Sequence, residues 1–241
     1  MAANSFNHIP RLYNEKSAEE ILPFVISNFN PASILDVGCG LGSWLSVAKK
    51  LGVSDITGID GWYVDTSKLY ISKDQFIKED LTKAFDLNRQ YDLLICLEVA
   101  EHIDEQYADI FIASLVKHSK VILFSAAIPE QVGENHVNEQ YPGYWQKKFQ
   151  QHGFEYYDIM RNRFWENDNI NWWYKQNMFI VAHKDAHLKF DVCEKIYTHV
   201  HPQLYIERMR LLKDILGENL KANFTGAARI LKQTILHKLK P

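Results

Sequence analysis

Short apolar runs alternate with longer amphipathic segments between residues 33 and 183. The apolar runs are four to six residues long, which predicts β-strands, and they lie at 33–37, 55–59, 75–78, 91–96 and 120–125. They are almost continuously hydrophobic, which is typical of parallel strands that helices cover on both faces. Helical periodicity over 42–51 and 104–117 separates some of these strands. The alternation therefore predicts βαβ units that form an open parallel sheet.

The flanking segments predict how the chain is organised. Two further strands are expected near 154–160 and 176–182, with an aromatic-rich insertion between them, and a helix near 17–28 precedes the first strand. The last 55 or so residues contain no strand pattern, and helical periodicity returns over 205–216 and 224–239. We expect one α/β domain over residues 1–184 and a helical C-terminal extension over residues 185–241.

Composition narrows the class of protein. The chain has 241 residues, 46% of them apolar and 24% charged, which is ordinary for a globular protein. Its net charge of −3, from 27 basic and 30 acidic residues, argues against a dedicated nucleic-acid binder. Three unpaired-looking cysteines, no signal-peptide pattern and no apolar run of about 18 residues favour a cytoplasmic protein.

A glycine-rich loop follows the first predicted strand. Asp36-Val37-Gly38-Cys39-Gly40-Leu41-Gly42 leads directly into a helix, so backbone N–H groups can face a ligand that approaches closely. A dinucleotide fingerprint would read G-x-G-x-x-G, whereas this loop reads G-x-G-x-G, with Ser43 in the place of the third glycine. The spacing therefore disfavours an oxidoreductase that binds a dinucleotide.

Two acidic residues at the ends of the next two strands extend this predicted ligand site. Asp60 ends the second strand and is placed to accept hydrogen bonds from both ribose hydroxyls. Asp80 follows the third strand and suits an adenine amino group. The carboxyl ends of parallel strands meet at one edge of a sheet, so these markers predict a single nucleoside site.

With these markers the sequence resembles the class I S-adenosylmethionine-dependent methyltransferases over about residues 30–183, chiefly through LDVGCGLG, GID and CLEVAEHI. The resemblance implies a Rossmann-like seven-stranded sheet whose last strand is antiparallel. It also implies that S-adenosylmethionine binds along the glycine loop, with Asp60 at the ribose, Asp80 at the adenine and Trp62 packed against it. The expected cofactor-binding set is Asp36, Gly38, Cys39, Gly40, Gly42, Asp60, Gly61, Trp62, Asp80, Leu81 and Leu97.

A cluster of two glutamates and a histidine follows the fourth strand. Glu98, Glu101 and His102 have i, i+3, i+4 spacing, which would place them on one face of a helical turn. The pattern E-x-x-E-H is similar to that of metal-dependent O-methyltransferases acting on ubiquinone precursors and on the 3′-terminal ribose of small RNAs. The resemblance implies Mg²⁺ or Mn²⁺ as a second cofactor, with His136 completing the site. A site without metal, in which His102 or His136 is the catalytic base, is the open alternative.

The acceptor pocket is expected in the loop after the fifth strand and in the aromatic insertion. Aromatic faces and amide side chains suit a sugar, and the expected contacts are Asn138, Tyr144, Trp145, Trp173 and Tyr174. Parts of both segments also resemble bacterial methyltransferases associated with surface-polysaccharide biosynthesis. We therefore predict an O-methyltransferase acting on a sugar, nucleotide sugar or glycan. The alternatives are a small secondary metabolite or an RNA 3′ end as acceptor, or a non-catalytic subunit that binds S-adenosylmethionine.

The C-terminal tail offers a further prediction. Between Glu218 and the end of the chain there are basic residues but no acidic ones, beside an apolar stripe at helical spacing. Such a helix can pack on the catalytic domain, form a homo-oligomer, or contact the inner face of a membrane peripherally.

Overall fold

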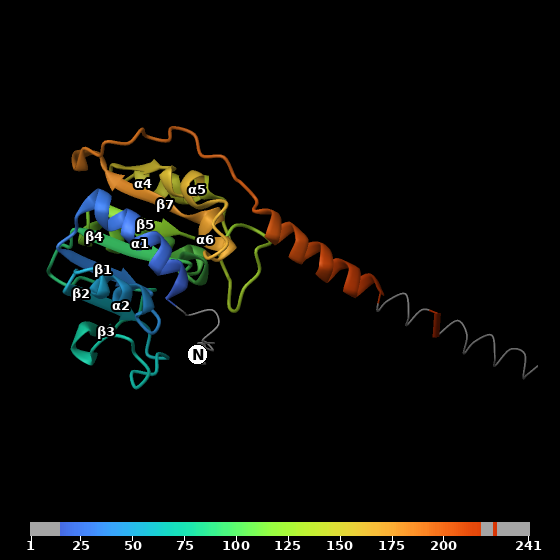
Figure 1. The fold of residues 1–241 in the computed structure, drawn as a ribbon, viewed down its shortest axis with the longest axis horizontal. Coiled ribbons are helices and arrows are strands. Elements are labelled where there is room, and N and C mark those ends of the chain that lie inside the picture. Colours follow the sequence, from blue (N-terminus) through green and yellow to red (C-terminus); the bar gives the residue numbers. More distant parts are fainter. Residues whose placement is uncertain (1–14, 218–223, 226–241) are drawn as a thin grey trace, which may run out of the picture. The chain divides into compact units, whose positions relative to one another are not determined.

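A single seven-stranded sheet forms the centre of the protein. The computed structural model describes residues 15–217 and 224–225, and the strand order is β3-β2-β1-β4-β5-β7-β6 (Figure 1). The strands are β1 (Ser33–Val37), β2 (Asp55–Asp60), β3 (Phe76–Lys78), β4 (Leu93–Leu97), β5 (Val121–Ser125), β6 (Phe154–Tyr157) and β7 (Phe179–His183). Only β7 runs antiparallel to its neighbours, β5 and β6, within this described sheet. The predicted α/β sheet with an antiparallel last strand is confirmed.

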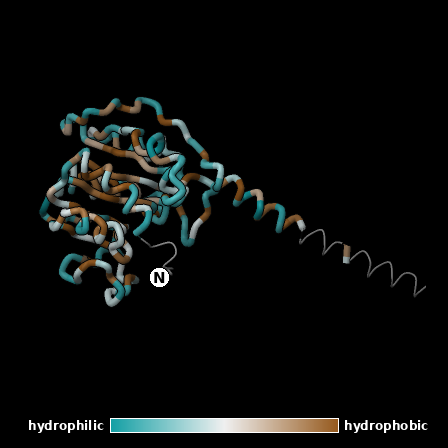
Figure 2. Tube along the Cα trace, in the orientation of Figure 1, coloured by the Kyte–Doolittle hydropathy of each residue, from teal (hydrophilic) through white to brown (hydrophobic). Residues whose placement is uncertain are grey.

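Helices cover both faces of the sheet. They are α1 (Lys16–Phe29), α2 (Ser43–Lys50), α3 (Ala108–His118), α4 (Pro142–Gln150), α5 (Ile159–Phe164) and α6 (Trp172–Asn177). Figure 1 shows α1 and α2 in front of the sheet, where they contribute to one buried cluster, while α3 and α4 contribute to a second. Successive strand residues alternate between the clusters: Ile95 belongs to the first and Leu94 and Cys96 to the second. Because both faces of the sheet are covered, the central strands β4 and β5 are mostly hydrophobic (Figure 2).

Several element boundaries differ from the predicted ones. The helix expected over 104–117 begins at Ala108, because two 3-10 turns, Ala100–His102 and Glu105–Tyr107, precede it. Asp104 caps the second of these turns by accepting a hydrogen bond from the Gln106 N–H at 3.1 Å. The last two strands are shorter than expected because α5 follows β6 closely and α6 directly precedes β7.

The chain divides into two compact units, residues 1–199 and 200–241. The sequence placed the division at residue 184, but residues 187–199 contain no helix or strand and bond to the first unit. The Cys193 N–H donates to the Tyr156 carbonyl at 2.7 Å, and the Arg161 guanidinium donates to the Tyr197 carbonyl at 3.0 Å.

In the second unit residues 202–217 are helical, which confirms the helix expected over 205–216. The basic tail and most of the helix expected over 224–239 lie outside the described residues. Among those that are described, none belongs to a helix long and apolar enough to span a bilayer.

Candidate active site

The carboxyl edge of the sheet gathers the chemically active side chains. The glycine loop follows β1, Asp60 ends β2, Glu98 follows β4, and a long loop over residues 126–141 follows β5. Because β7 is antiparallel, the residues that precede it lie at this same edge, so α6 also contributes to the site. This edge is where open α/β sheets bind their ligands.

The glycine loop is held in a backbone conformation that only glycine adopts easily. Gly38, Gly40 and Gly42 have φ angles of 77°, 55° and 80°. A Cβ atom on Gly38 would overlap the side chain of Val99 in the turn after β4. The loop expected to bind the cofactor therefore packs directly against the turn that carries Glu98 and Glu101.

The Asp60 side chain is hydrogen-bonded to the glycine loop. Its carboxylate is buried and accepts hydrogen bonds from the N–H groups of Gly40, at 2.7 Å, and Gly61, at 2.6 Å. The Tyr63 hydroxyl also donates to Asp60, and the Tyr63 ring folds over Gly61, where a Cβ would collide with it. A ribose that bonds to Oδ1 of Asp60 would therefore compete with the Tyr63 hydroxyl.

Asp36 is buried beside this arrangement. Its Oδ2 atom accepts no hydrogen bond from any described residue. Burial raises the pKa of Asp36 well above its usual value, and the negative charge of Asp60 raises it further. An unsatisfied buried carboxylate favours a positively charged or hydrogen-bond-donating ligand at this position.

The remaining residues of the expected cofactor set are placed in different ways. Asp80 is held by its own turn, accepting from the Thr82 N–H and hydroxyl and pairing with Lys83 at 3.0 Å. Trp62 is 63% exposed and is available to a ligand rather than being part of the core. Three others are buried in the two hydrophobic clusters: Cys39, Leu81 and Leu97.

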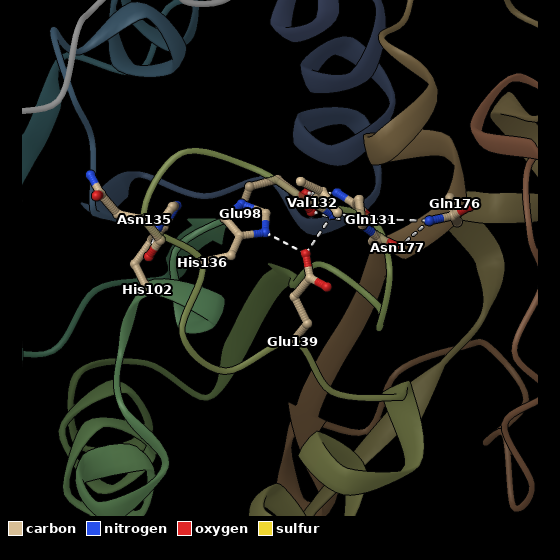
Figure 3. Close-up of polar contacts among 9 residues, drawn as sticks. All are labelled: Glu98, His102, Gln131, Val132, Asn135, His136, Glu139, Gln176 and Asn177. Carbon is tan, nitrogen blue, oxygen red and sulfur yellow. Dashed lines mark hydrogen bonds and ion pairs between the residues drawn. The ribbon is translucent and has the colours of Figure 1, made fainter. Parts of the chain in front are cut away.

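Glu98 is separated from Glu101 and His102 by the local backbone. Glu98 has a φ of 54°, and the 3-10 turn begins only at Ala100, so the expected helical face with all three side chains does not form. The Glu98 carboxylate instead accepts from Gln131 Nε2 at 2.8 Å and from Asn177 Nδ2 at 3.2 Å (Figure 3). Gln176 Nε2 donates to Gln131 Oε1 at 3.1 Å, which extends the network.

The pKa of Glu98 reflects these surroundings. Burial raises the pKa of Glu98 to about 7, although hydrogen bonds from Ser125, Asn177 and Gln131 partly offset the effect. The amide donors favour the ionised form and hold the Glu98 carboxyl group in a fixed direction.

Glu101, His102 and His136 converge at the candidate metal centre. One potential ligand atom from each lies within 4.8 Å of the other two. Glu101 is 0% exposed, and neither of its carboxylate oxygens accepts a hydrogen bond from any described residue. Burial raises the pKa of Glu101 well above its usual value and the Glu98 charge adds to this, while backbone amides of Glu101 and Ala127 offset only part.

The two histidines of this cluster each have Nδ1 engaged by an oxygen atom. Burial lowers the pKa of His102 to about 4, with a contribution from His136. Nδ1 of His102 lies 3.2 Å from the Asn135 carbonyl oxygen, and Nδ1 of His136 lies 2.7 Å from Glu139 Oε1 (Figure 3). Both acceptors require a hydrogen on Nδ1, which leaves Nε2 as the nitrogen that can bind a metal or accept a proton.

The side chains expected to contact the acceptor have mixed positions. Trp145 needs correction: it is 1% exposed and packs on Phe124 in the core, so it offers no surface to a substrate. Asn138 is buried and donates to the Ile103 carbonyl at 3.0 Å. Tyr144, Trp173 and Tyr174 are partly exposed, which is compatible with a pocket wall.

Several polar residues at this site were not predicted, namely Tyr63, Gln131, Glu139, Gln176 and Asn177. The direction of the last strand could have indicated Gln176 and Asn177, because residues before an antiparallel strand reach the edge where parallel strands end. Nothing comparable in the sequence distinguishes Glu139 from other acidic loop residues.

Comparison with known proteins identifies the family. Residues 8–184 match the family described as "Methyltransferase domain", and the chain belongs to this family. The chain is 34% identical over 108 residues to a ribosomal protein L11 methyltransferase from Laribacter hongkongensis, covering 42% of this chain and 35% of that protein. It is also 34% identical over 116 residues to a ubiquinone biosynthesis O-methyltransferase from Rickettsia prowazekii, covering 44% of each. The chain thus spans less than half the length of these relatives.

A solved structure shares the fold. Magnesium protoporphyrin IX methyltransferase from Synechocystis PCC 6803, determined with bound S-adenosylmethionine, superposes with a TM-score of 0.52. The sequence identity is 17%, and the match covers 72% of this chain and 81% of that one. The match supports the Rossmann-like methyltransferase fold.

Proposed function

We propose that this protein is an S-adenosylmethionine-dependent O-methyltransferase whose acceptor hydroxyl is activated at the Glu101–His102–His136 cluster. The observation that carries the proposal is the Glu101 carboxylate, which is fully buried, unsatisfied, and next to two imidazoles with Nδ1 engaged. A buried carboxylate beside two imidazoles is a donor set that suits a divalent cation.

The residues near the glycine loop fit S-adenosylmethionine. Three left-handed glycines allow a ligand to approach the backbone, and Asp60 offers a carboxylate at the loop for ribose hydroxyls. The unsatisfied Oδ2 of Asp36 suits an ammonium group, such as the amino group of the methionyl part. Both features therefore match the charge and shape of this methyl donor.

The residues of the cluster also fit Mg²⁺ or Mn²⁺, which when bound would lower the pKa of an acceptor hydroxyl and fix its direction. Glu101, His102 and His136 would hold the ion. We do not include Glu98 among the ligands, because its two oxygens already accept from Gln131 and Asn177.

The chemical step is an in-line displacement. The acceptor oxygen forms a bond to the methyl carbon while the carbon–sulfur bond breaks and its electron pair remains on sulfur. Without a metal, the hydroxyl proton passes to Nε2 of His102 or of His136, because both imidazoles carry a hydrogen on Nδ1. If both Nε2 atoms hold an ion, they would not be free to accept it, and the proton would pass to solvent water. The fixed carboxylate of Glu98 can orient the attacking hydroxyl.

For the acceptor we propose a hydroxyl of a sugar, nucleotide sugar or glycan. The partly exposed rings of Trp173 and Tyr174 offer stacking faces. The buried amides of Gln131 and Asn177 hold the Glu98 carboxyl group, which can bond a sugar hydroxyl. A small aromatic diol is the second candidate. It is favoured by Val132 and Val137, which flank His136 and are 60% and 59% exposed, and by the O-methyltransferase relatives.

Turnover of the methyl donor tests the proposal. Formation of S-adenosylhomocysteine would be measured with nucleotide sugars, glycans and catechols as acceptors, in EDTA and after addition of Mn²⁺. Turnover that stops in EDTA, returns with Mn²⁺ and is lost in Glu101→Gln supports the metal-assisted reaction. Full turnover in EDTA leaves a histidine as the base and excludes the metal, whereas binding of the donor with no turnover on any acceptor favours a non-catalytic subunit.

A further inference from the structure

Glu139 lies in the loop over residues 126–141 and contacts His136 of the candidate metal centre. One oxygen, Oε1, accepts from Nδ1 of His136 at 2.7 Å and from the N–H of Val132 at 2.6 Å (Figure 3). The Glu139 side chain is only partly exposed. Its partner His136 lies three residues earlier in the chain. A single carboxylate therefore holds both the His136 imidazole and the backbone at Val132.

The first of these contacts determines which nitrogen of His136 carries the hydrogen. A carboxylate can only accept, so Nδ1 must be protonated and, in the neutral imidazole, Nε2 keeps its lone pair. The ring also has a defined place, because it packs edge to face on His102 with 4.9 Å between centroids. A Cβ on Gly133 would overlap the His136 ring, so the loop leaves room for the ring in this orientation only because residue 133 is glycine.

The second contact supports a strained backbone. Val132 has a φ of 55°, which is unfavourable for a β-branched residue, and Glu130 and Asn135 in the same loop have φ angles of 68° and 60°. Two further hydrogen bonds tie the end of the loop to the cluster, from the N–H groups of Val137 and Asn138 to the Glu101 carbonyl at 2.9 and 3.0 Å. The part of the loop over residues 132–138 is thus fixed on both sides of His136.

We infer that Glu139 is a positioning residue that sets the Nδ1-protonated tautomer of His136 and so directs its Nε2 lone pair to the candidate metal and proton-transfer site. The inference deepens the proposed function and rests on it for the role of His136, but the tautomer itself can be measured independently. A group that holds a metal-binding or basic histidine in this way is expected to change affinity or activity by about 10- to 100-fold.

The matched control is Glu134, which lies in the same loop and is exposed. Glu134→Ala removes the same kind of charge from the same loop without touching His136. Glu139→Gln keeps an oxygen that can accept from both donors, whereas Glu139→Ala removes the acceptor altogether.

If the loop lost its conformation in Glu139→Ala, the effect on His136 could not be attributed to the missing carboxylate. A double variant therefore separates support of the loop from orientation of His136. Val132→Gly relieves the strain, because glycine adopts a φ of 55° readily. If Glu139 only supports the loop, Val132→Gly/Glu139→Ala recovers wild-type behaviour. If Glu139 orients His136, the double variant folds but does not recover it.

The primary experiment is ¹⁵N NMR of the histidine side chains in the full chain at a pH of about 8, where an ordinary histidine is neutral. Wild type, Glu134→Ala and Glu139→Gln should show His136 with a protonated Nδ1. Glu139→Ala and the double variant should show the Nε2-protonated form. The affinity for Mn²⁺, measured by electron paramagnetic resonance without substrate, should fall by about tenfold or more in the same two variants.

The outcomes distinguish the two proposals. An Nε2-protonated His136 in wild type, or wild-type tautomer and Mn²⁺ affinity in the double variant, overturns the role of Glu139 whatever the enzyme's turnover. Absence of turnover and of Mn²⁺ binding in wild type would instead count against the proposed function, and the tautomer measurement would still stand by itself.

Discussion

Replacing Glu101 by glutamine tests the central feature of the candidate metal centre. The wild-type carboxylate is fully buried and accepts no hydrogen bond from any described residue. Glutamine has nearly the same shape but is neutral, so it costs less to bury. We expect Glu101→Gln to stabilise the metal-free protein and to lose the response to divalent cations.

The magnitude follows from the burial of an unsatisfied group. Leaving a buried polar group unpaired costs about 1–3 kcal/mol, and more for a charge. For a protein of this size each kcal/mol shifts the Tm by about 2–4 °C, so the metal-free variant should melt several degrees above wild type. Mn²⁺ at about 100 times its Kd should stabilise wild type by about 2.7 kcal/mol and leave the variant unchanged.

The pH dependence gives a second, independent signature. The pKa of Glu101 in the folded protein lies above its ordinary value of 4.5, so folding favours the protonated form. Wild type therefore loses stability as the pH rises above about 4.5, whereas the glutamine variant does not lose this contribution. The stability difference between them should grow with pH until Glu101 is ionised in the folded state.

Thermal melts in EDTA and in Mn²⁺, at several pH values, provide the measurement. Glu105→Gln is the control, because Glu105 lies in the adjacent 3-10 turn and is exposed. A variant at Glu101 that melts below wild type in EDTA would mean that the carboxylate has stabilising partners in solution. An equal Mn²⁺ shift in both proteins would mean that the ion binds elsewhere. Either result refutes the reasoning.

Four further outcomes are expected. Asp60→Ala should weaken S-adenosylmethionine binding by roughly 2–4 kcal/mol in calorimetry, because ribose hydroxyls lose a buried acceptor. Tyr63→Phe should tighten that binding severalfold in the same titration, because the phenol no longer competes for Asp60. Gly38→Ala should abolish donor binding in the titration while the fold persists by circular dichroism, because a Cβ there overlaps Val99. Since the pKa of His102 falls from 6.5 to about 4 on folding, up to about 3 kcal/mol of stability should be lost in urea titrations as the pH drops through that range.

The sequence predicted the sheet well because the signal is local and redundant. The central parallel strands are buried on both faces, and continuous apolar runs such as Leu93–Leu97 follow directly from that burial. The short helices α4, α5 and α6 were not predicted, because segments of six to nine residues are too short to establish a helical repeat. Their conformation depends on packing against the sheet.

The candidate site was predictable only where its parts are close in sequence. The glycine loop and Asp60 are recognisable because they end successive strands. The surroundings of Glu98 are not, since its hydrogen-bond donors Gln131 and Asn177 lie 33 and 79 residues away. The expectation that Glu98, Glu101 and His102 share a helical face was wrong, because the backbone at Glu98 is left-handed and the 3-10 turn begins only at Ala100.

The reversed direction of β7 also has a consequence for the order in which the protein matures during synthesis. A nascent chain that has released β1 to β5 already contains the glycine loop, Asp60 and the whole Glu101–His102–His136 cluster once residue 136 has emerged. It still lacks Gln176 and Asn177, and β5 has a bare edge until β7 pairs with it. At that stage Glu98 lacks its Asn177 donor, and a buried carboxylate without its donors is costly. The glycine loop and Asp60 can therefore assemble early, whereas the hydrogen-bond network around Glu98 waits for the last strand to be inserted between β5 and β6.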